Sequence, residues 1–340
     1  MVNKEADVTV GPMLKRLADC AGLVYTAVDG DQHGLLMGMV QWARTLGLEV
    51  LSGGKARNAE FVYDPLTLTV TYGQDQVNLD QAEAEFLAPI SPGRAEEFVR
   101  RRAELLGRLG LGAGSDLVEM AIAANATGLL PDVETLHAPV LRIREIPEVL
   151  SPRAEGGILA LRGAVDMVTC LRHADGPGMG GGVFLVVGCD NAYSREMLTT
   201  KGLLPNGRGT TALIYRPHHL VGVETPMTVL LLAALGGIAT GATEYMPRVD
   251  VVARAARDLR AGERLGGDHA PALQALVRPA QAVGPGAPLP LHLGYGNLLT
   301  MDVPMGAVIT GAMVQKPDDS TLWALRERQD REFLPLTPPL

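Results

Sequence analysis

A lysine beside two glycines is the first feature of this sequence that could do chemistry. Gly53-Gly54-Lys55 follows an apolar run, Leu48 to Leu51, which predicts a strand. Open α/β sheets bind ligands at the carboxyl ends of their strands, and the glycines would let a substrate approach the backbone. Lys55 could therefore hold an anionic substrate or polarise a carbonyl group. The alternative is an ordinary exposed lysine at a turn.

Carboxylates and histidines follow two other predicted strands. Asp31 and His33 lie in the segment Asp29-Gly30-Asp31-Gln32-His33, before a predicted helix. Asp31 could transfer protons or cap the helix, and the spacing matches no known metal site, so we expect no metal. His218 and His219 end a predicted strand, where neighbouring side chains point to opposite faces. At most one of these two histidines should enter any given site.

Two further patterns are weaker signals. Glu119 and Asn125 lie six residues apart on a predicted helix and could hydrogen-bond a hydroxylated substrate, although capping and structural bonding are alternatives. The strings Gly176–Gly181 and Gly207–Ala212 match the dinucleotide fingerprints GxGxxG and GxGxxA by letter. Each runs into an apolar strand instead of the helix N-terminus that a pyrophosphate needs. We therefore predict that both strings are hairpin loops.

The elements that carry these residues change character along the chain. Up to residue 52 the pattern alternates: a helix around Met13 to Ala18, a strand at Leu23–Val28, a helix around Leu36 to Ala43, and the strand at Leu48–Leu51. This alternation indicates the end of a parallel α/β sheet. Met1 to Asp7 reads as the tail of an internal strand, so we expect the rest of a nucleotide-binding domain upstream.

Residues 53–247 predict a mixed α+β region. Alternating residues from Phe61 to Val77 indicate strands. Ser91-Pro92 signals a helix through Arg108, and Asp116 with Glu119 forms a capping box for a helix at Leu117–Thr127. Further strands are predicted at 157–162, 164–171, 183–188 and 210–215, and a buried helix at 226–241. Residues 248–317 are rich in short apolar runs and turns, and 318–340 form a charged, then proline-rich, tail.

Composition excludes several classes of protein. The 340 residues, 47% of them hydrophobic, can bury more than one core. The net charge of −8 argues against a nucleic-acid partner. Three cysteines (Cys20, Cys170 and Cys189) without metal spacing suit a reducing compartment. No signal peptide is visible and the longest apolar run is too short to cross a membrane, so we expect a cytoplasmic protein with no membrane partner.

Several strings together carry a family resemblance. They are MVNKEAD (1–7), VDGDQHGLL (28–36), QWARTLGLEVLSGGK (41–55), VEMAIAANATGL (118–129) and IYRPHHLVGVE (214–224). They resemble the homoserine-dehydrogenase-like NAD(P)-dependent oxidoreductases, whose characterised branch is the deoxyxylulose-phosphate-reductoisomerase-like enzymes. Residues 255–265 and 301–309 resemble the SAF module, a small β-clip domain. The resemblance implies an α/β and α+β fold: the end of a Rossmann-like domain (1–52), an α+β catalytic and dimerisation domain (53–247), a SAF-like domain (248–317) and a C-terminal tail (318–340).

The resemblance also assigns roles to residues. It implies NAD or NADP as cofactor, with Asn3 and Lys4 near it. Lys55 and Lys4 would bind substrate oxygens, with Asp31 or His218 as proton-transfer groups, and Glu119, Asn125 and His219 would contact substrate. The chain departs from the family pattern at 54–58, where GKARN replaces GKGTK, and at 112–120, where Gly112 and Ser115 replace an acidic residue and a lysine.

Two functions follow from these observations. The first is an oxidoreductase acting on a small hydroxylated, anionic metabolite. The second is a non-redox derivative of that family, either an isomerase or lyase, or a SAF-bearing subunit that needs a separate nucleotide-binding partner. We expect a homo-oligomer, and we expect the chain by itself to bind NAD(P) weakly or not at all.

Overall fold

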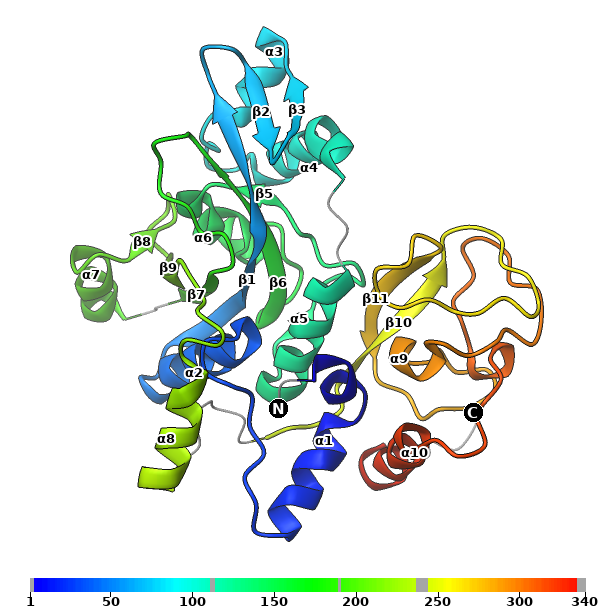
Figure 1. Cartoon of the computed structure of the whole chain (residues 1–340). Coiled ribbons are helices and arrows are strands. Elements are labelled where there is room, and N and C mark those ends of the chain that lie inside the picture. Colours follow the sequence, from blue (N-terminus) through cyan, green and yellow to red (C-terminus); the bar gives the residue numbers. More distant parts are fainter. Residues whose placement is uncertain (1–2, 111–113, 189–190, 237–243, 335–340) are drawn as a thin grey trace. The chain divides into compact units, whose positions relative to one another are not determined.

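The computed structural model describes residues 3–110, 114–188, 191–236 and 244–334 (Figure 1). The fold is mixed α+β, as the sequence predicts. Two compact units are present, and each combines distant segments of the chain. The first unit contains Met1–Val28, Gly112–Thr135 and Met227–Leu340, and the second contains Asp29–Leu111 and Leu136–Pro226. The three-domain division expected from the resemblance stays a prediction.

The second unit is built on a mainly antiparallel sheet around one long strand, β1 (Glu49–Asp64). β1 pairs in parallel with β6 (Ala164–Arg172) and antiparallel with β7 (Val183–Gly188), and β7 pairs antiparallel with β9 (Thr211–Arg216). Shorter strands extend the sheet: β2 (Thr69–Tyr72), β3 (Asp75–Asn78), β5 (Val140–Leu141) and β8 (Leu204–Pro205).

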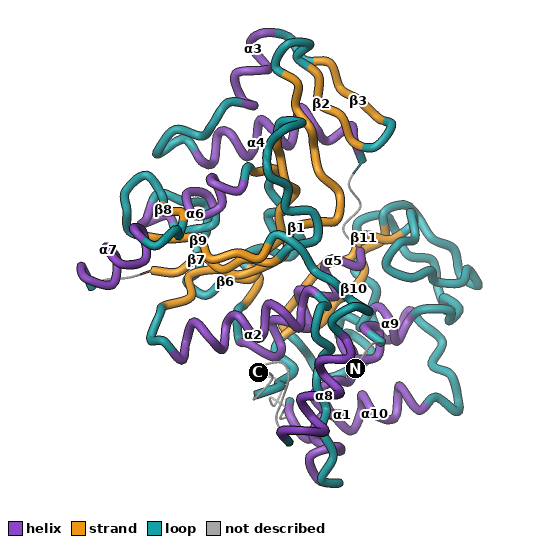
Figure 2. The backbone as a smooth tube through the Cα atoms, turned by 60° about the vertical axis from the view of Figure 1, so that its left-hand side comes forward, coloured by secondary structure: helices purple, strands orange, loops and turns teal. Residues whose placement is uncertain are grey.

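Helices cover this sheet. α2 (Gln32–Thr45) runs along one face beside β1 and β7 (Figure 2). A buried apolar cluster lies between the sheet and the helices α4 (Ala95–Leu106) and α6 (Ile146–Val149). It includes Phe184 and Val186 of β7 together with Val149 of α6. The remaining elements of this unit are α3 (Gln81–Ala84), α7 (Ala192–Thr200) and the 3-10 helices η1 (Glu85–Leu87), η2 (Gly107–Leu109), η3 (Ile143–Glu145) and η4 (Arg153–Glu155).

The first unit packs helices around a two-stranded ribbon. α1 (Lys4–Cys20) contacts α5 (Gly114–Thr127) and α10 (Thr321–Phe333), and α5 contacts β10 (Val249–Ala255), which pairs antiparallel with β11 (Leu273–Pro279). The short elements are β4 (Leu130–Pro131), α9 (Leu291–Gly294) and η5 (Gly311–Met313). α8 (Thr225–Leu235) begins in the second unit and continues into the first.

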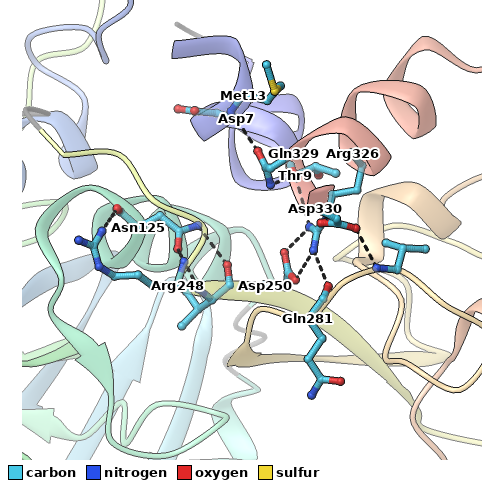
Figure 3. A network of polar contacts seen from close by, with 12 residues as sticks. Asp7, Thr9, Met13, Asn125, Arg248, Asp250, Gln281, Arg326, Gln329 and Asp330 are labelled. Atoms are coloured by element: carbon cyan, nitrogen blue, oxygen red, sulfur yellow. Dashed lines mark hydrogen bonds and ion pairs between the residues drawn. The ribbon is translucent and has the colours of Figure 1, made fainter. Parts of the chain in front are cut away.

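A buried polar network holds the first unit together (Figure 3). The fully buried Arg326 of α10 donates to both Asp250 carboxylate oxygens on β10 and to Asp330 at 2.7 Å. Pro12 lies inside α1. One residue further on, the side-chain amide of Gln329 binds the Met13 N–H and the Thr9 carbonyl, the two groups that would hydrogen-bond to each other in a regular helix. It accepts from the Met13 N–H at 3.1 Å and donates to the Thr9 carbonyl at 3.2 Å.

The first 28 residues differ from their prediction. The expected strand tail at Met1–Asp7 is wrong, because the described part of this segment is helical from Lys4 and Asn3 is the N-cap, whose side chain accepts the Ala6 N–H. The expected strand at Leu23–Val28 is also wrong. Residues 23–28 form no strand, and the apolar side chains of Leu23 and Val24 are 65% and 52% exposed. Without that strand, the predicted helix–strand alternation fails here.

Several other boundaries also change. Residues 157–162 form no strand, only a single bridge from Leu159 to Pro152. The helix expected from Ser91 begins at Ala95, after a turn closed by the Arg94 N–H and the Ser91 carbonyl. Asp116 lies inside α5, so it does not cap that helix. The helices α2, α5 and α8 and the strands β1, β6, β7 and β9 were predicted from the sequence and are present.

The helix expected to be buried at 226–241 is exposed in its described part. α8 carries no charged residue, which suggested a core helix. Yet Val229, Leu230 and Leu235 are 64%, 60% and 74% exposed, and Thr228 is the buried residue of the helix. Residues 237–241 lie outside the described residues, as do Met1, Val2, Gly112, Cys189 and the prolines of the tail.

Candidate active site

The residues singled out in the sequence fall into two groups, one in each unit. Asp31, Lys55, His218 and His219 belong to the second unit. Asn3, Lys4, Glu119 and Asn125 belong to the first.

Lys55 lies within a strand and is buried. The expectation of a lysine at a strand's carboxyl end is wrong, because β1 continues to Asp64 and the Lys55 side chain is only 2% exposed. Lys55 sits between Met167 of β6 and Val183 of β7. Gly54, the residue before it, lies in the strand and not in a turn. It must be glycine because a Cβ there would lie 1.8 Å from the carbonyl oxygen of Asp166. Lys55 is therefore held inside the sheet, with a paired strand on either side.

The N-terminus of α2 lies beside this part of β1. Asp31 is the N-cap of α2, and its carboxylate accepts the Gln32 N–H at 2.9 Å. His33 is 1% exposed, and its Nδ1 lies 3.6 Å from an Asp31 carboxylate oxygen, beyond hydrogen-bond distance. Gln32 Nε2 donates to the carbonyl oxygens of Ala56, at 2.9 Å, and Gly181, at 2.8 Å. Gln32 thus ties α2, β1 and the glycine-rich loop together.

The glycine-rich loop joins β6 to β7. These strands flank β1 on either side, so the predicted hairpin between paired strands is wrong for Gly176–Gly181. Glu60 holds the loop by accepting the N–H groups of Met179 and Gly180 at 2.6 and 2.8 Å, and it pairs with Arg172 at 2.7 Å. Burial acts to raise the pKa of the Glu60 carboxyl, but the Arg172 bond and the two backbone N–H groups together lower it below its usual value.

His219 lies against this loop and His218 is exposed. A Cβ on Gly181 would lie 2.4 Å from His219 Nδ1 and 2.6 Å from Asn58 Oδ1. Gly181 has φ +78°, which favours glycine, so the backbone and the close side chains both require glycine here. We name the set Asp31, Gln32, Lys55, Asn58, Gly181 and His219 the polar cluster.

In the first unit, Lys4 and Glu119 form an ion pair. The Lys4 side chain is 29% exposed and that of Glu119 8%. The Asn125 amide has a structural arrangement: its oxygen accepts the N–H groups of Arg248 and Val249 at 2.8 and 2.9 Å, and its nitrogen donates to the Val249 carbonyl at 3.1 Å (Figure 3). These bonds fix α5 to the start of β10.

Neither glycine string fits a dinucleotide pyrophosphate, and the N-terminus of α2 does not fit one either. Gly176–Gly181 leads into β7, and Gly207 lies in the hairpin between β8 and β9 that the sequence predicted. The N-terminus of α2 presents Asp31, whose charge opposes a phosphate. Across the same residues, no group of three His, Cys, Asp or Glu side chains has the placement of a metal site.

Sequence reasoning missed Gln32 and Glu60. Gln32 lies between two residues that it did single out, and its amide can bridge two carbonyls only because three segments meet there. Glu60 binds a loop 119 residues further along the chain, and no local pattern signals such a contact.

Comparison with known families now adds a finding to this geometry. Residues 111–225 match the family model described as oxidoreductase DRL, catalytic domain. The match covers less than half of the chain and supports an oxidoreductase family. It includes Glu119, Asn125, His218 and His219, whereas Lys4, Asp31 and Lys55 lie before it. No curated protein matches the chain. Within the described ranges, the helices are too short or too polar to cross a membrane.

Proposed function

We propose that the chain is an NAD(P)-dependent oxidoreductase that acts on a small hydroxylated, anionic metabolite in the cytoplasm. The match of residues 111–225 to an oxidoreductase catalytic domain carries this proposal. The resemblance of the sequence to homoserine-dehydrogenase-like enzymes, with a Rossmann-like segment and a SAF-like domain, agrees with it.

The polar cluster supplies the chemistry that such a substrate needs. Lys55 offers a cation on a buried strand, where attraction to a substrate anion is stronger than in water. His219 is partly exposed beside Gly181 and can exchange a proton with a substrate hydroxyl. Asp31 uses one carboxylate oxygen to cap α2, which favours positioning over proton transfer. Lys4 with Glu119 is a second candidate pair for substrate oxygens.

The nicotinamide nucleotide is the part of the proposal that this geometry supports least. Because neither glycine string leads into a helix, we propose that the described residues hold its pyrophosphate weakly and that a separate nucleotide-binding subunit can supply this part.

We further propose that the chain forms a homo-oligomer. α8 exposes Val229, Leu230 and Leu235, a larger apolar surface than a lone helix normally leaves in water. Light scattering should give a mass above that of a monomer, and Leu230→Glu should lower it. A monomer at tens of micromolar would contradict this part of the proposal.

The test of activity combines substrate screening with a matched pair of lysine variants. Purified protein is incubated with each nicotinamide nucleotide and a panel of hydroxy acids and phosphorylated alcohols, and the reduced nucleotide is followed by absorbance. Lys55→Met keeps the length of the side chain but removes its charge. It should lower kcat/KM by about ten- to a hundredfold, the loss expected for a charge-assisted hydrogen bond.

Lys201→Met is the control, because Lys201 is exposed in the same unit and lies outside the polar cluster. It should leave kcat/KM unchanged. Equal activity of wild type and Lys55→Met would remove Lys55 from the site. No turnover of any substrate class, either by the chain alone at millimolar nucleotide or with a nucleotide-binding subunit added, would contradict the oxidoreductase assignment.

A further inference from the structure

The segment between β9 and α8 carries both histidines that the sequence singled out. It runs from Pro217 to Glu224 and contains turns and bends but no helix or strand. We call residues 217–224 the histidine segment. Within it, His219 lies against the glycine-rich loop, whereas His218 is exposed. Because the segment has no regular secondary structure, other contacts must keep His219 in this position.

The backbone of the histidine segment lies close to glycines of two other elements. A Cβ on Gly182, at the end of the glycine-rich loop, would lie 2.3 Å from the carbonyl oxygen of Arg216. A Cβ on Gly30, in the turn before α2, would lie 2.7 Å from the carbonyl oxygen of Leu220. His219 is between these two points in the sequence. The packing therefore fixes the backbone on either side of this histidine.

Hydrogen bonds hold the second half of the segment. The Leu220 carbonyl accepts the N–H groups of Val223 and Glu224, at 3.0 and 2.9 Å. The Gly222 N–H donates to Thr225 Oγ1 at 3.1 Å, which ties this turn to the start of α8. In the described chain, the backbone of residues 217–219 makes no hydrogen bond to another backbone group. The half that carries the histidines therefore depends on what joins its two ends.

An ion pair joins these ends. Arg216, the last residue of β9, donates through Nη2 to the Glu224 carboxylate at the end of the histidine segment. The two side chains are 30% and 20% exposed, so they are partly shielded from water. Shielding strengthens the attraction between opposite charges, and a hydrogen bond between charged groups is stronger than one between neutral groups. The pair thus closes the segment that carries His219.

We propose that Arg216 and Glu224 are positioning residues. Their ion pair holds His219 against Gly181 and Asn58, and its effect on turnover rests on the proposed function, in which His219 exchanges a proton with the substrate. A proton-transfer group must lie within hydrogen-bond reach of the atom that it serves. A misplacement of about 1 Å can cost a hundredfold in rate. A partly exposed ion pair contributes little to overall stability, so breaking it should displace His219 without unfolding the protein.

Nuclear magnetic resonance of protein labelled at glycine and histidine tests the position directly. In wild type, an Overhauser contact should join the α-hydrogens of Gly181 and the ring of His219, because a Cβ in their place would lie 2.4 Å from Nδ1. Glu224→Gln and Arg216→Met should each weaken this contact and speed hydrogen exchange at 222–224. The double variant Arg216→Glu/Glu224→Arg, which exchanges the two charges, should restore the contact.

Kinetics with a substrate found by the screen above tests the consequence. Both single variants should lower kcat by about tenfold and change KM little, because His219 acts in the chemical step. The two variants remove opposite charges, so an effect of charge alone would act in opposite directions, whereas displacement of His219 acts in the same direction. The control is Glu49→Gln, which breaks an exposed ion pair with Arg162 in the same unit and should change neither measurement.

The magnetic resonance result does not depend on activity, so the two proposals can fail separately. An unchanged contact between Gly181 and His219 in both single variants would overturn the positioning role, whatever the kinetics. Opposite changes of kcat in the two variants would also overturn it. A weakened contact in a protein that turns over no substrate would support the positioning role and contradict the proposed function. If Arg216→Met does not fold, Arg216→Ala/Glu224→Ala, which leaves no charge unpaired, provides the same comparison.

Discussion

The network around Arg326 and the polar cluster around Gly181 differ in burial and in hydrogen bonding, because Arg326 is fully buried whereas Asn58 and His219 of the cluster are not. Every guanidinium nitrogen of Arg326 donates to a carboxylate or a carbonyl within the first unit (Figure 3). Next to the polar cluster, the buried His33 Nδ1 has no hydrogen-bond partner among the described residues, and His219 of the cluster is partly exposed. A fully bonded network stabilises one packing arrangement, whereas a partly bonded one retains capacity for a ligand. We therefore expect the first region to contribute mainly to stability, and the second remains our proposal for a ligand site.

Removing Arg326 should have the largest effect on stability. Arg326→Met would leave the carboxylates of Asp250 and Asp330 buried without their cation, at a cost of about 3–5 kcal/mol in the free energy of unfolding. Urea denaturation measures this cost. The matched control is Arg328→Met on the same helix, whose ion pair with Glu332 lies at the surface and should contribute far less to stability. Similar losses in both variants would show that the buried ion pairs of Arg326 stabilise the fold no more than the surface ion pair of Arg328.

Gln329→Leu tests the link between α10 and α1. The change removes the amide that bonds Met13 N–H and Thr9 C=O beside Pro12. The buried Met13 N–H loses this acceptor, whereas the Thr9 carbonyl keeps its bond from Arg326 Nη1. We expect a loss of about 1–3 kcal/mol, smaller than for Arg326 because no charge is exposed to an apolar core. Hydrogen exchange at the Met13 amide should also become faster. Unchanged exchange at Met13 would indicate that α1 satisfies this step without Gln329.

These regions also differ in how far the sequence could predict them. Apolar periodicity found α2, β6, β7 and β9, because each of them buries a face whose pattern is local. From the sequence, the glycines before Lys55 are expected at the carboxyl end of a strand, where they would let a substrate approach the backbone. Their actual cause is the close approach of β6 to Gly54, and that depends on a strand more than a hundred residues away.

Two other errors have the same origin. Leu23–Val28 has the composition of a strand, but no partner strand pairs with it. α8 has the composition of a core helix, but its described residues leave most side chains exposed. Propensity describes what a segment can form, while pairing and burial are decided by the rest of the chain. The contacts of Gln32 and Glu60 could not be predicted for the same reason.

Gly181→Ala would break the polar cluster at its most crowded point. The change forces a side chain onto a residue with φ +78° and places Cβ 2.4 Å from His219 Nδ1. The matched control is Gly209→Ala, which has φ +67° but no atom within 4 Å of the new Cβ. The backbone cost of about 1–2 kcal/mol is common to both, so a greater loss at position 181 measures the crowding at His219. Equal losses would mean that His219 moves away freely.

The smallest effect should come from Glu60, and it should depend on pH. The pKa of its carboxyl in the folded protein lies below the ordinary value of 4.5, so its charged form stabilises the glycine-rich loop. That stabilisation is fully present above the unfolded-state pKa and is lost as the pH falls through the lower folded-state value. Glu60→Gln should therefore be less stable than wild type near pH 7, by less than about 1 kcal/mol because the carboxyl is partly solvated. The difference should shrink below about pH 4.

Hydrogen exchange at Met179 and Gly180 in both proteins locates the effect, since these N–H groups bond the Glu60 carboxylate. A stability difference that stays constant down to acid pH would show that the shape of the side chain holds the loop, and not its charge.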